Sequence, residues 1–459
     1  MKKYLIWFVH EHVEFRHAEL QSLIELLGAK LEFLERKIDG RRLWMVDTSE
    51  EFVEPPWMIV ACEELEHILN ICRRSILIRY VIELYAQGES FEEVVNELKQ
   101  QDIEAHDDLF KFEVEAFGRR KISREEKVAK MERLSFLPLN GSVSLKDYKH
   151  AYYIIEYYGQ ENNVFRENPL RVFFGRLVAE GRRDLVDWLS LKKRLFIANT
   201  SMDPTLSIVM SNMAKSKEAD LVFDPFVGSA SLLVAAALHG AYVLGMDIDF
   251  LLLHGRAKPS RCKVEKRQAG ESVYNNLKQY GVEKKYLDVI VGDSSLPVLR
   301  HLTMNAILTD PPYGIRESTE RIGTRKNKYG GLNHAPEDHY PSKVSYNLDE
   351  VVRDLMKFSA ATLPIGGRLV FWIPVFREDF IRDLDRGKAC PKHPCFSMVA
   401  CSEQRLTTHS SRMLFTFEKV KELEESDLQK LSDPSLSLDQ DQQSFRDKYF
   451  GKYDPRISP

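Results

Sequence analysis

The segment LVFDPFVGSAS at residues 221–231 decides the fold of this chain. Its first residues are apolar and lead into Asp224, Gly228 then permits a close backbone approach, and the run Leu232 to His239 has helical character before Gly240. A buried strand that passes through a glycine turn into a helix is typical of a doubly wound α/β sheet, whose ligands gather at the carboxyl ends of its strands. The segment therefore predicts a Rossmann-like domain with a ligand site at Asp224.

Two further strands end in acidic residues. The strand from Ala241 to Met246 is followed by Asp247, 23 residues after Asp224 (247 − 224), and the strand from Leu287 to Val291 is followed by Gly292 and Asp293. A ribose-binding carboxylate is expected about 20 residues after the first strand of such folds. Each aspartate alone is more often a helix cap or a turn residue. Three at successive strand ends favour a cationic, phosphate-free nucleoside such as S-adenosylmethionine, because clustered carboxylates repel a pyrophosphate.

A second motif, TDPPYG at residues 309–314, follows the apolar run 306–308. The two prolines restrict the backbone and lack N–H donors. Asp310 and the carbonyl of Pro311 can each accept one hydrogen of an exocyclic amine, and Tyr313 offers a ring for stacking. The motif therefore predicts alkylation of an amino group, although a Pro-Pro turn that merely ends a buried strand is the simpler interpretation of the hexapeptide alone.

Together these segments resemble a known family. The stretches DPFVG (224–228), GMDID (245–249) and TDPPYGIRE (309–317) are similar to those of class I methyltransferases. With FIANTSMD at 196–203, the chain more narrowly resembles the catalytic subunit of eukaryotic tRNA guanine-N2-methyltransferases that modify guanosine 10, from the N-terminus to about Lys421. The resemblance implies a seven-stranded, mostly parallel sheet, S-adenosylmethionine as cofactor, and the N2 of a guanosine in tRNA as acceptor. It also implies a heterodimer with a small zinc-binding activator subunit.

The site residues follow from the motifs and from this resemblance. We predict that a guanosine is extruded from the tRNA and stacks on Tyr313. The predicted catalytic residues are Asp310, Pro311, Pro312 and Tyr313. The predicted cofactor-binding residues are Thr200 and Ser201, both by resemblance, and Asp224, Phe226, Gly228, Asp247, Ile248, Asp293 and Ser294.

The chain is expected to have two folded domains and a tail. Residues 1–165 alternate strands and helices without nucleotide-binding signals, which predicts an α+β region of ferredoxin-like units, with a THUMP-like RNA-binding module implied by the resemblance. Residues 166–421 form the predicted methyltransferase domain. Residues 422–459 are rich in Ser, Asp and Gln and are predicted to be disordered. The segment 316–343 is predicted to be a mobile substrate loop.

Basic residues gather in two stretches, although the formal net charge of the chain is −4. A solvated helix face explains either stretch about as well, but their position beside a base-modifying domain favours phosphate contacts. The predicted RNA-binding residues are Arg119, Arg120, Lys121, Arg182, Lys192, Lys193 and Arg194.

Composition fits a cytoplasmic enzyme. Of 459 residues, 44% are hydrophobic and 29% charged, and no apolar run approaches the ~20 residues of a membrane span. Six cysteines are scattered, and the cluster at 390–395 has no second Cys/His pair nearby, so no metal site is expected. The apolar strand 287–291 is predicted to lie towards a sheet edge, where a partner could add a strand.

Two other functions fit parts of the pattern. A DNA adenine-N6 methyltransferase would share the Asp-Pro-Pro-Tyr turn, but it should not need an N-terminal RNA-binding region. A non-catalytic RNA-binding subunit is the other alternative, because Ala230 and Ser231 stand where the resembled enzymes usually carry further glycines.

Overall fold

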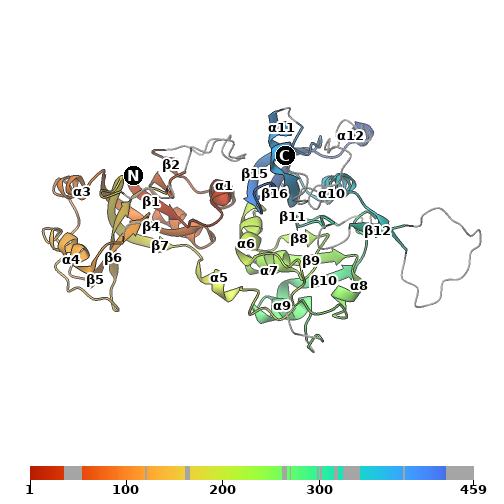
Figure 1. The fold of residues 1–459 in the computed structure, drawn as a ribbon, viewed down its shortest axis with the longest axis horizontal. Helices are drawn as coiled ribbons and strands as arrows, with labels where there is room; N and C mark the ends of the chain where they lie inside the picture. The colour runs from red at the N-terminus through yellow and green to blue at the C-terminus, as the bar shows by residue number, and fades with distance from the viewer. Residues whose placement is uncertain are drawn as a thin grey trace, which may run out of the picture. The chain divides into compact units, whose positions relative to one another are not determined.

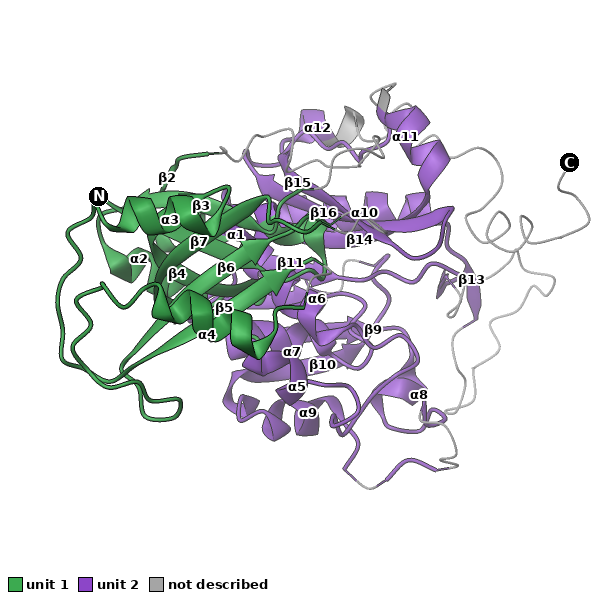
Figure 2. Ribbon diagram, turned by 60° about the vertical axis from the view of Figure 1, so that its left-hand side comes forward, with its two compact units in different colours: residues 1–16, 23–38, 49–183 green, residues 17–22, 39–48, 184–459 purple. Residues whose placement is uncertain are grey.

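The computed structural model describes residues 1–35, 54–118, 121–160, 166–260, 266–268, 270–296, 299, 302–314, 319–323, 342–385 and 388–430. The chain forms two compact units: residues 1–16, 23–38 and 49–183, and residues 17–22, 39–48 and 184–459 (Figure 2). Among the described residues, no helix combines the length and apolarity that crossing a membrane requires.

The first unit is built on one seven-stranded sheet with the order β2-β3-β1-β4-β7-β6-β5 (Figure 1). Strands β5 and β6 are parallel, and the other neighbouring pairs are antiparallel. The strands are β1 (Lys2–Phe8), β2 (Glu32–Phe33), β3 (Trp57–Cys62), β4 (Ile78–Gly88), β5 (Phe110–Phe117), β6 (His150–Tyr157) and β7 (Arg171–Glu180). The helices are α2 (Leu65–Cys72), α3 (Phe91–Leu98) and α4 (Arg124–Glu132), together with both ends of α1 (Arg16–Leu27), whose residues 17–22 belong to the second unit.

Apolar side chains cover both faces of this first sheet. Successive strand residues point to opposite faces, so Tyr152 and Ile154 of β6 join the cluster of Val94 and Leu98 from α3. Tyr153 and Ile155 join the other cluster, in which the buried ring of Trp7 stacks on Trp57 at a centroid distance of 5.6 Å. Two cores on one sheet make the first unit a separately folded α+β body.

The second unit carries a seven-stranded sheet with the order β10-β9-β8-β11-β14-β16-β15. The strands are β8 (Leu221–Asp224), β9 (Tyr242–Asp247), β10 (Tyr286–Val291), β11 (Ala306–Thr309), β14 (Arg368–Phe376), β15 (Phe396–Arg405) and β16 (Ser410–Lys419), with the separate hairpin β12 (Glu320–Ile322) and β13 (Lys343–Ser345). The helices are α5 (Asp184–Trp188), α6 (Pro204–Met213), α7 (Ser231–Leu238), α8 (Phe250–Leu253), α9 (Val273–Gln279), α10 (Leu348–Thr362), α11 (Arg377–Asp385) and α12 (Glu425–Lys430).

The first five strands of this order run parallel and only β16 runs against its neighbours. Every residue of β14 is buried, as expected for a central strand that is covered on both faces. The sheet is the one predicted from the sequence, and its strand order places β8 between β9 and β11. The ends of these three strands, which carry the motifs, therefore lie side by side.

Most predicted elements are confirmed, and the omissions have clear causes. The strands at β8, β9, β10 and β11 and the edge position of β10 match the prediction. Strands β6, β7 and β15 are not identified by sequence, because their buried pattern is not the simple alternation of polar and apolar residues that marks a half-exposed strand.

The domain limits can be refined from strand pairing. Strand β7 pairs with β4 and β6 of the first sheet, and the units divide after Arg183 rather than at residue 165. We therefore propose residue 183 as the end of the N-terminal region. In the predicted tail, α12 (Glu425–Lys430) is helical, and residues 431–459 lie outside the described part of the chain.

Candidate active site

The acidic strand ends meet at one edge of the second sheet. Asp224 pairs in register with Gly245 of β9, and Asp247 pairs with Val291 of β10, two residues before Asp293. Parallel strands end at the same edge, so this register brings the three predicted carboxylates together. The structure thus assembles the group that the sequence analysis predicted from strand spacing alone.

Asp224 is the most buried of these acids, with 2% of its surface exposed. Its Oδ1 accepts hydrogen bonds from Thr309 Oγ1 at 2.7 Å and from the Phe226 backbone N–H at 3.0 Å. Burial raises the pKa of Asp224 to about 7, and the nearby Asp247 and Asp310 add to the increase. Thr309 directly precedes Asp310, so this hydrogen bond ties the acceptor motif to the end of β8.

The glycine turn is fixed by a second carboxylate. Asp247 Oδ2 accepts from the backbone N–H of Gly228 at 2.8 Å, and its Oδ1 accepts from Asp249 N at 2.9 Å. Gly228 has φ +48°, which favours glycine, and a Cβ at this residue would meet no atom within 4 Å. The turn is therefore left-handed and faces open space, as a backbone that approaches a ligand requires. Ala230 also takes a left-handed φ of 63°.

The segment that leads to α6 closes the other side of this turn. Ser201 Oγ lies 2.6 Å from Ser229 Oγ and also accepts from Ala198 N at 2.8 Å, while Thr200 beside it is exposed. Asn276 of α9, fully buried, donates to the carbonyls of Phe196 and Ser229. This position was not identified from the sequence, because an asparagine in a helix gives no signal that it bridges two distant loops.

Arg194 requires a correction. It was predicted to contact RNA, but only 1% of its surface is exposed. Its Nη1 donates to Ser231 Oγ at 2.7 Å, and its guanidinium lies 5.6 Å from the centre of the Tyr280 ring. A buried guanidinium cannot reach a phosphate, and Arg194 instead supports the first turn of α7 from inside. The pattern of basic residues along the sequence does not distinguish the buried Arg194 from its exposed neighbours.

Asp293 and Ser294 lie where the third strand ends, beside the β12–β13 hairpin. Asp293 is 2% exposed, and its two carboxylate oxygens accept from the backbone N–H groups of Ser295 (2.8 Å) and Ile322 (2.5 Å). Each oxygen has a further lone pair for a ligand. The hairpin is the described part of the predicted substrate loop, of which residues 316–318 and 324–341 lie outside the described residues.

The acceptor turn is held by an arginine from the antiparallel strand. Arg412 of β16 donates through Nη1 to Asp310 Oδ2 at 3.1 Å, and its guanidinium stacks 4.2 Å from the centre of the Trp372 ring. Its Nε also donates to Gln404 at 2.6 Å. Arg412 was not predicted, because it lies 102 residues from Asp310 and only strand order brings the two together.

The other residues of the acceptor turn are conformationally restricted and partly buried. Pro311 is buried, whereas Pro312 and Tyr313 are partly exposed. Within the described residues the Tyr313 hydroxyl is covered yet finds no hydrogen-bond partner. Gly314 ends the turn with φ +77°.

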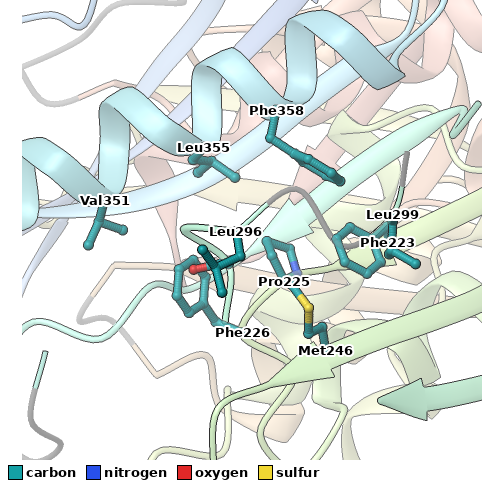
Figure 3. A pocket seen from close by; sticks show the side chains of 10 residues that line it. Phe223, Pro225, Phe226, Met246, Leu296, Leu299, Val351, Leu355 and Phe358 are labelled. Atoms are coloured by element: carbon teal, nitrogen blue, oxygen red, sulfur yellow. The ribbon is translucent and has the colours of Figure 1, made fainter. Parts of the chain in front are cut away.

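Behind the acids lies a small apolar cavity between the sheet edge and α10 (Figure 3). Val351, Leu355 and Phe358 of α10 face Pro225 and Phe226 across it. Its volume of about 10 Å³ is that of roughly one water molecule, too small for a purine. This cavity is therefore part of the packing that supports Phe226 and cannot itself hold a nucleoside. Ile248, which follows Asp247, is half-buried beside that turn.

The remaining residues that were predicted to contact RNA differ in their exposure to solvent. Lys121, Lys192 and Lys193 are exposed, with Lys193 Nζ 2.5 Å from Asp187. Arg182 is half-buried. Arg119 and Arg120 lie outside the described residues.

Known proteins share this arrangement along the whole chain. The profile of the Tmrp11 THUMP N-terminal domain matches residues 2–183, and that of the RMKL-like methyltransferase domain matches residues 192–325. The bovine protein named tRNA (guanine(10)-N(2))-methyltransferase TRMT11 is 40% identical over 467 residues, covering 100% of this chain and 97% of its own. This chain belongs to the TRMT11 family.

Other members are similar over the same length. The human TRMT11 protein is 40% identical and covers 100% of this chain and 97% of its own, and the Dictyostelium discoideum protein is 32% identical with 99% and 87% coverage. Among solved structures, TrmN from Thermus thermophilus aligns with 91% of this chain and 100% of its own, at 17% identity and a TM-score of 0.42. The TRMT11 family membership confirms the resemblance drawn from the motifs.

Replacing Arg412 by Gln should slow turnover by about 10²-fold, because Asp310 then loses the group that orients it. Cofactor affinity should change less than turnover, since the charged partner of Arg412 is Asp310 on the acceptor turn, and towards the 196–203 segment it makes only a 3.5 Å contact with Met202 Sδ. Steady-state kinetics and calorimetric titration of the cofactor measure the two effects. Arg405→Gln, at the exposed end of β15, is the matched control and should behave as wild type. Equal activity of the two variants would remove Arg412 from the site.

Asp224→Asn should change how stability depends on pH. The folded pKa of Asp224 lies above its unfolded value, so folding favours the protonated form and the wild type loses stability as pH rises from the unfolded value to about 7. The variant has no carboxyl group at residue 224, so ionisation there cannot lower its free energy of unfolding. Its free energy of unfolding should exceed that of the wild type by on the order of 1–4 kcal/mol at about pH 8 and by little at about pH 4. Denaturant unfolding at the two pH values measures this, and a pH-independent difference would contradict the assignment.

Proposed function

We propose that this chain is a tRNA methyltransferase that transfers a methyl group from S-adenosylmethionine to the exocyclic N2 of guanosine 10. Its similarity to the TRMT11 proteins extends over the full chain, including an N-terminal THUMP region and a methyltransferase domain. The observation that carries the proposal is the hydrogen bond from Thr309 to Asp224. This bond joins the turn at Asp310 to the acidic strand end at Asp224, which supports a single pocket for the methyl donor and the acceptor.

The residues at this edge fit S-adenosylmethionine. The left-handed turn at Gly228 leaves open space, and the carboxylates of Asp224 and Asp247 suit a cationic ligand with a ribose diol. We assign Asp247 and Ile248 to the ribose side and Phe226, Asp293 and Ser294 to the base. Thr200, Ser201, Asp224 and Gly228 would hold the methionine part.

The cofactor supplies an electrophilic methyl group on a sulfonium. The chain prepares the acceptor: the Tyr313 ring stacks on the flipped guanine, and Asp310 with the Pro311 carbonyl accepts the two N2 hydrogens. Pro312 keeps the turn rigid. Guanine N2 is a poor nucleophile because its lone pair is delocalised into the ring, and these hydrogen bonds favour a pyramidal nitrogen. They therefore stabilise the transition state more than the bound substrate. Asp310 can accept the N2 proton that is lost after transfer.

Asp310→Asn should reduce methylation of tRNA by at least about 10³-fold, because an amide is a weaker acceptor and carries no charge. Binding of S-adenosylmethionine should persist, since Asp310 lies on the acceptor side. Incorporation of labelled methyl into tRNA that lacks this modification measures the first effect, and calorimetry measures the second.

The substrate controls test the proposed function separately. A tRNA with inosine in place of guanosine 10 lacks the N2 amine and should accept no methyl group from the wild type. Duplex DNA should also be inert. Near-wild-type activity of Asp310→Asn would overturn the mechanism, and transfer to adenine in DNA would overturn the proposed function.

The exposed basic residues support tRNA binding. We assign Lys121, Arg182, Lys192 and Lys193, together with Arg119 and Arg120, to phosphate contacts. Such contacts release counterions, so affinity for tRNA should fall steeply with salt. We place the enzyme in the cytoplasm, where its tRNA substrate is available.

A partner strand fits the open edge of the second sheet. Strand β10 is the terminal strand of that sheet, and 51% of Leu287 and 45% of Val291 remain exposed on it. Unpaired edge strands with apolar side chains are sites for strand addition or aggregation. We infer that a small zinc-binding activator subunit covers this edge and forms a heterodimer with the catalytic chain.

Co-expression with that activator should yield a stable complex, whereas the lone chain should aggregate in size-exclusion chromatography. Leu287→Lys should abolish co-purification by adding charge to the covered edge. Leu406→Lys, equally exposed at the turn between β15 and β16 on the opposite end of the sheet, should leave it intact. A lone chain that is monodisperse and fully active would contradict the need for a partner.

A further inference from the structure

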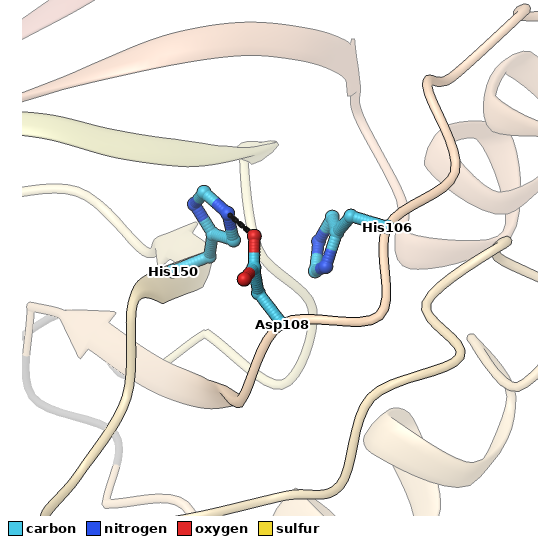
Figure 4. Close-up of side chains that lie close together, drawn as sticks. All are labelled: His106, Asp108 and His150. Carbon is cyan, nitrogen blue, oxygen red and sulfur yellow. Dashed lines mark hydrogen bonds and ion pairs between the residues drawn. The ribbon is translucent and has the colours of Figure 1, made fainter.

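Two histidines and an aspartate converge in the N-terminal unit, away from the methyltransferase motifs (Figure 4). His106 and Asp108 lie just before β5, and His150 is the first residue of β6. One ligand atom from each side chain lies within 4.8 Å of the other two. The imidazole rings of His106 and His150 have centroids 4.5 Å apart. Two ligands at about 2.0–2.2 Å from one zinc ion lie at most about 4.4 Å apart, so these side chains need only a small approach to share an ion.

The hydrogen bonds around His106 suit a metal ligand. Its Nε2 lies 2.7 Å from the Tyr152 hydroxyl, whereas Nδ1 is buried without a hydrogen-bond partner in the described structure. If Nε2–H donates to the Tyr152 oxygen, the neutral ring presents an unprotonated Nδ1. Metal-bound histidines ordinarily use one ring nitrogen for the ion and the other for such a supporting hydrogen bond. The unprotonated Nδ1 is thus available to coordinate a cation.

The site has access to solvent and to a coordinating water. His106, Asp108 and His150 line a cavity of about 620 Å³ with mostly polar walls, to which Glu97 and Asp102 also contribute. One cation already lies near the carboxylate: Lys149 Nζ is 2.9 Å from Asp108 Oδ2, but its side chain is 68% exposed and can move away. Asp108 Oδ2 also accepts from His150 Nε2 at 3.2 Å, a contact that an ion between them would replace.

We propose that His106, Asp108 and His150 bind one divalent cation of the zinc class, with water from the cavity completing the coordination. Imidazole nitrogens with a carboxylate suit zinc and its neighbours better than magnesium or calcium, which prefer oxygen ligands alone. The ion would join the segment before β5 to the start of β6 and so brace the far edge of the first sheet. This cluster has no sequence signal beyond His-x-Asp, because His150 lies 42 residues from Asp108.

Titration of the full-length chain with zinc chloride under reducing conditions tests this proposal. The wild type should bind one zinc ion at this site, and metal analysis after dialysis should find it retained. His106→Gln with His150→Gln keeps hydrogen-bonding side chains and should weaken that binding by at least about 100-fold. His254→Gln, an exposed histidine of the second unit, is the matched control and should bind as the wild type does.

Two further measurements distinguish zinc bound at this site from zinc bound by the cysteines. Zinc should raise the melting temperature of the wild type and of His254→Gln but not of the double variant. Cobalt bound in place of zinc should show no thiolate charge-transfer band. Lys149→Met, which removes the competing cation, should bind zinc at least as tightly as the wild type.

Absence of zinc binding by the wild type, or unchanged binding by a folded double variant, would overturn the proposal. Circular dichroism of the metal-free variants establishes that they are folded. Methyl transfer is measured in parallel, and its loss alone would not bear on the ion.

Discussion

A buried carboxylate organises the second unit of this protein. Asp224 ends the strand that starts the methyltransferase sheet, and it is almost completely removed from solvent while it accepts hydrogen bonds from Thr309 and Phe226. Burying a carboxylate is costly unless hydrogen bonds or a positive charge compensate. Burial raises the pKa of Asp224 to about 7, because these hydrogen bonds only partly offset the loss of hydration. A cationic cofactor would supply a compensating positive charge. The buried carboxylate that lowers the stability of the fold would therefore favour binding of that cofactor.

The acceptor side is held by a positive charge instead. Arg412 donates to Asp310 and is itself held flat against Trp372 and by Gln404. The two aspartates thus differ in environment: Asp224 is buried among hydrogen-bond donors, whereas Asp310 is paired with an arginine.

Sequence and structure agree where the signal is local. A strand, a turn and a helix are adjacent in the chain, so the DPFVG and DPPY motifs could be placed on the correct strand ends. The parallel arrangement of those strands could then be inferred from the doubly wound fold. The residues that support those motifs come from far away. Nothing in the sequence marks Arg412, Asn276 or the buried Arg194 as different from other polar residues. Only tertiary packing shows that they hold the motifs in place and are not exposed surface residues. The same limit concealed the cluster of His106, Asp108 and His150.

The central claim is that cofactor and acceptor share the edge formed by Asp224, Asp247, Asp293 and the 310–313 turn. A crystal structure of the chain with S-adenosylhomocysteine tests it most directly. We predict that the ribose hydroxyls lie within hydrogen-bond distance of Asp247 and that the sulfur faces the side chain of Asp310. Electron density for the ligand elsewhere on the molecule, or a sulfur directed away from residue 310, would contradict the account.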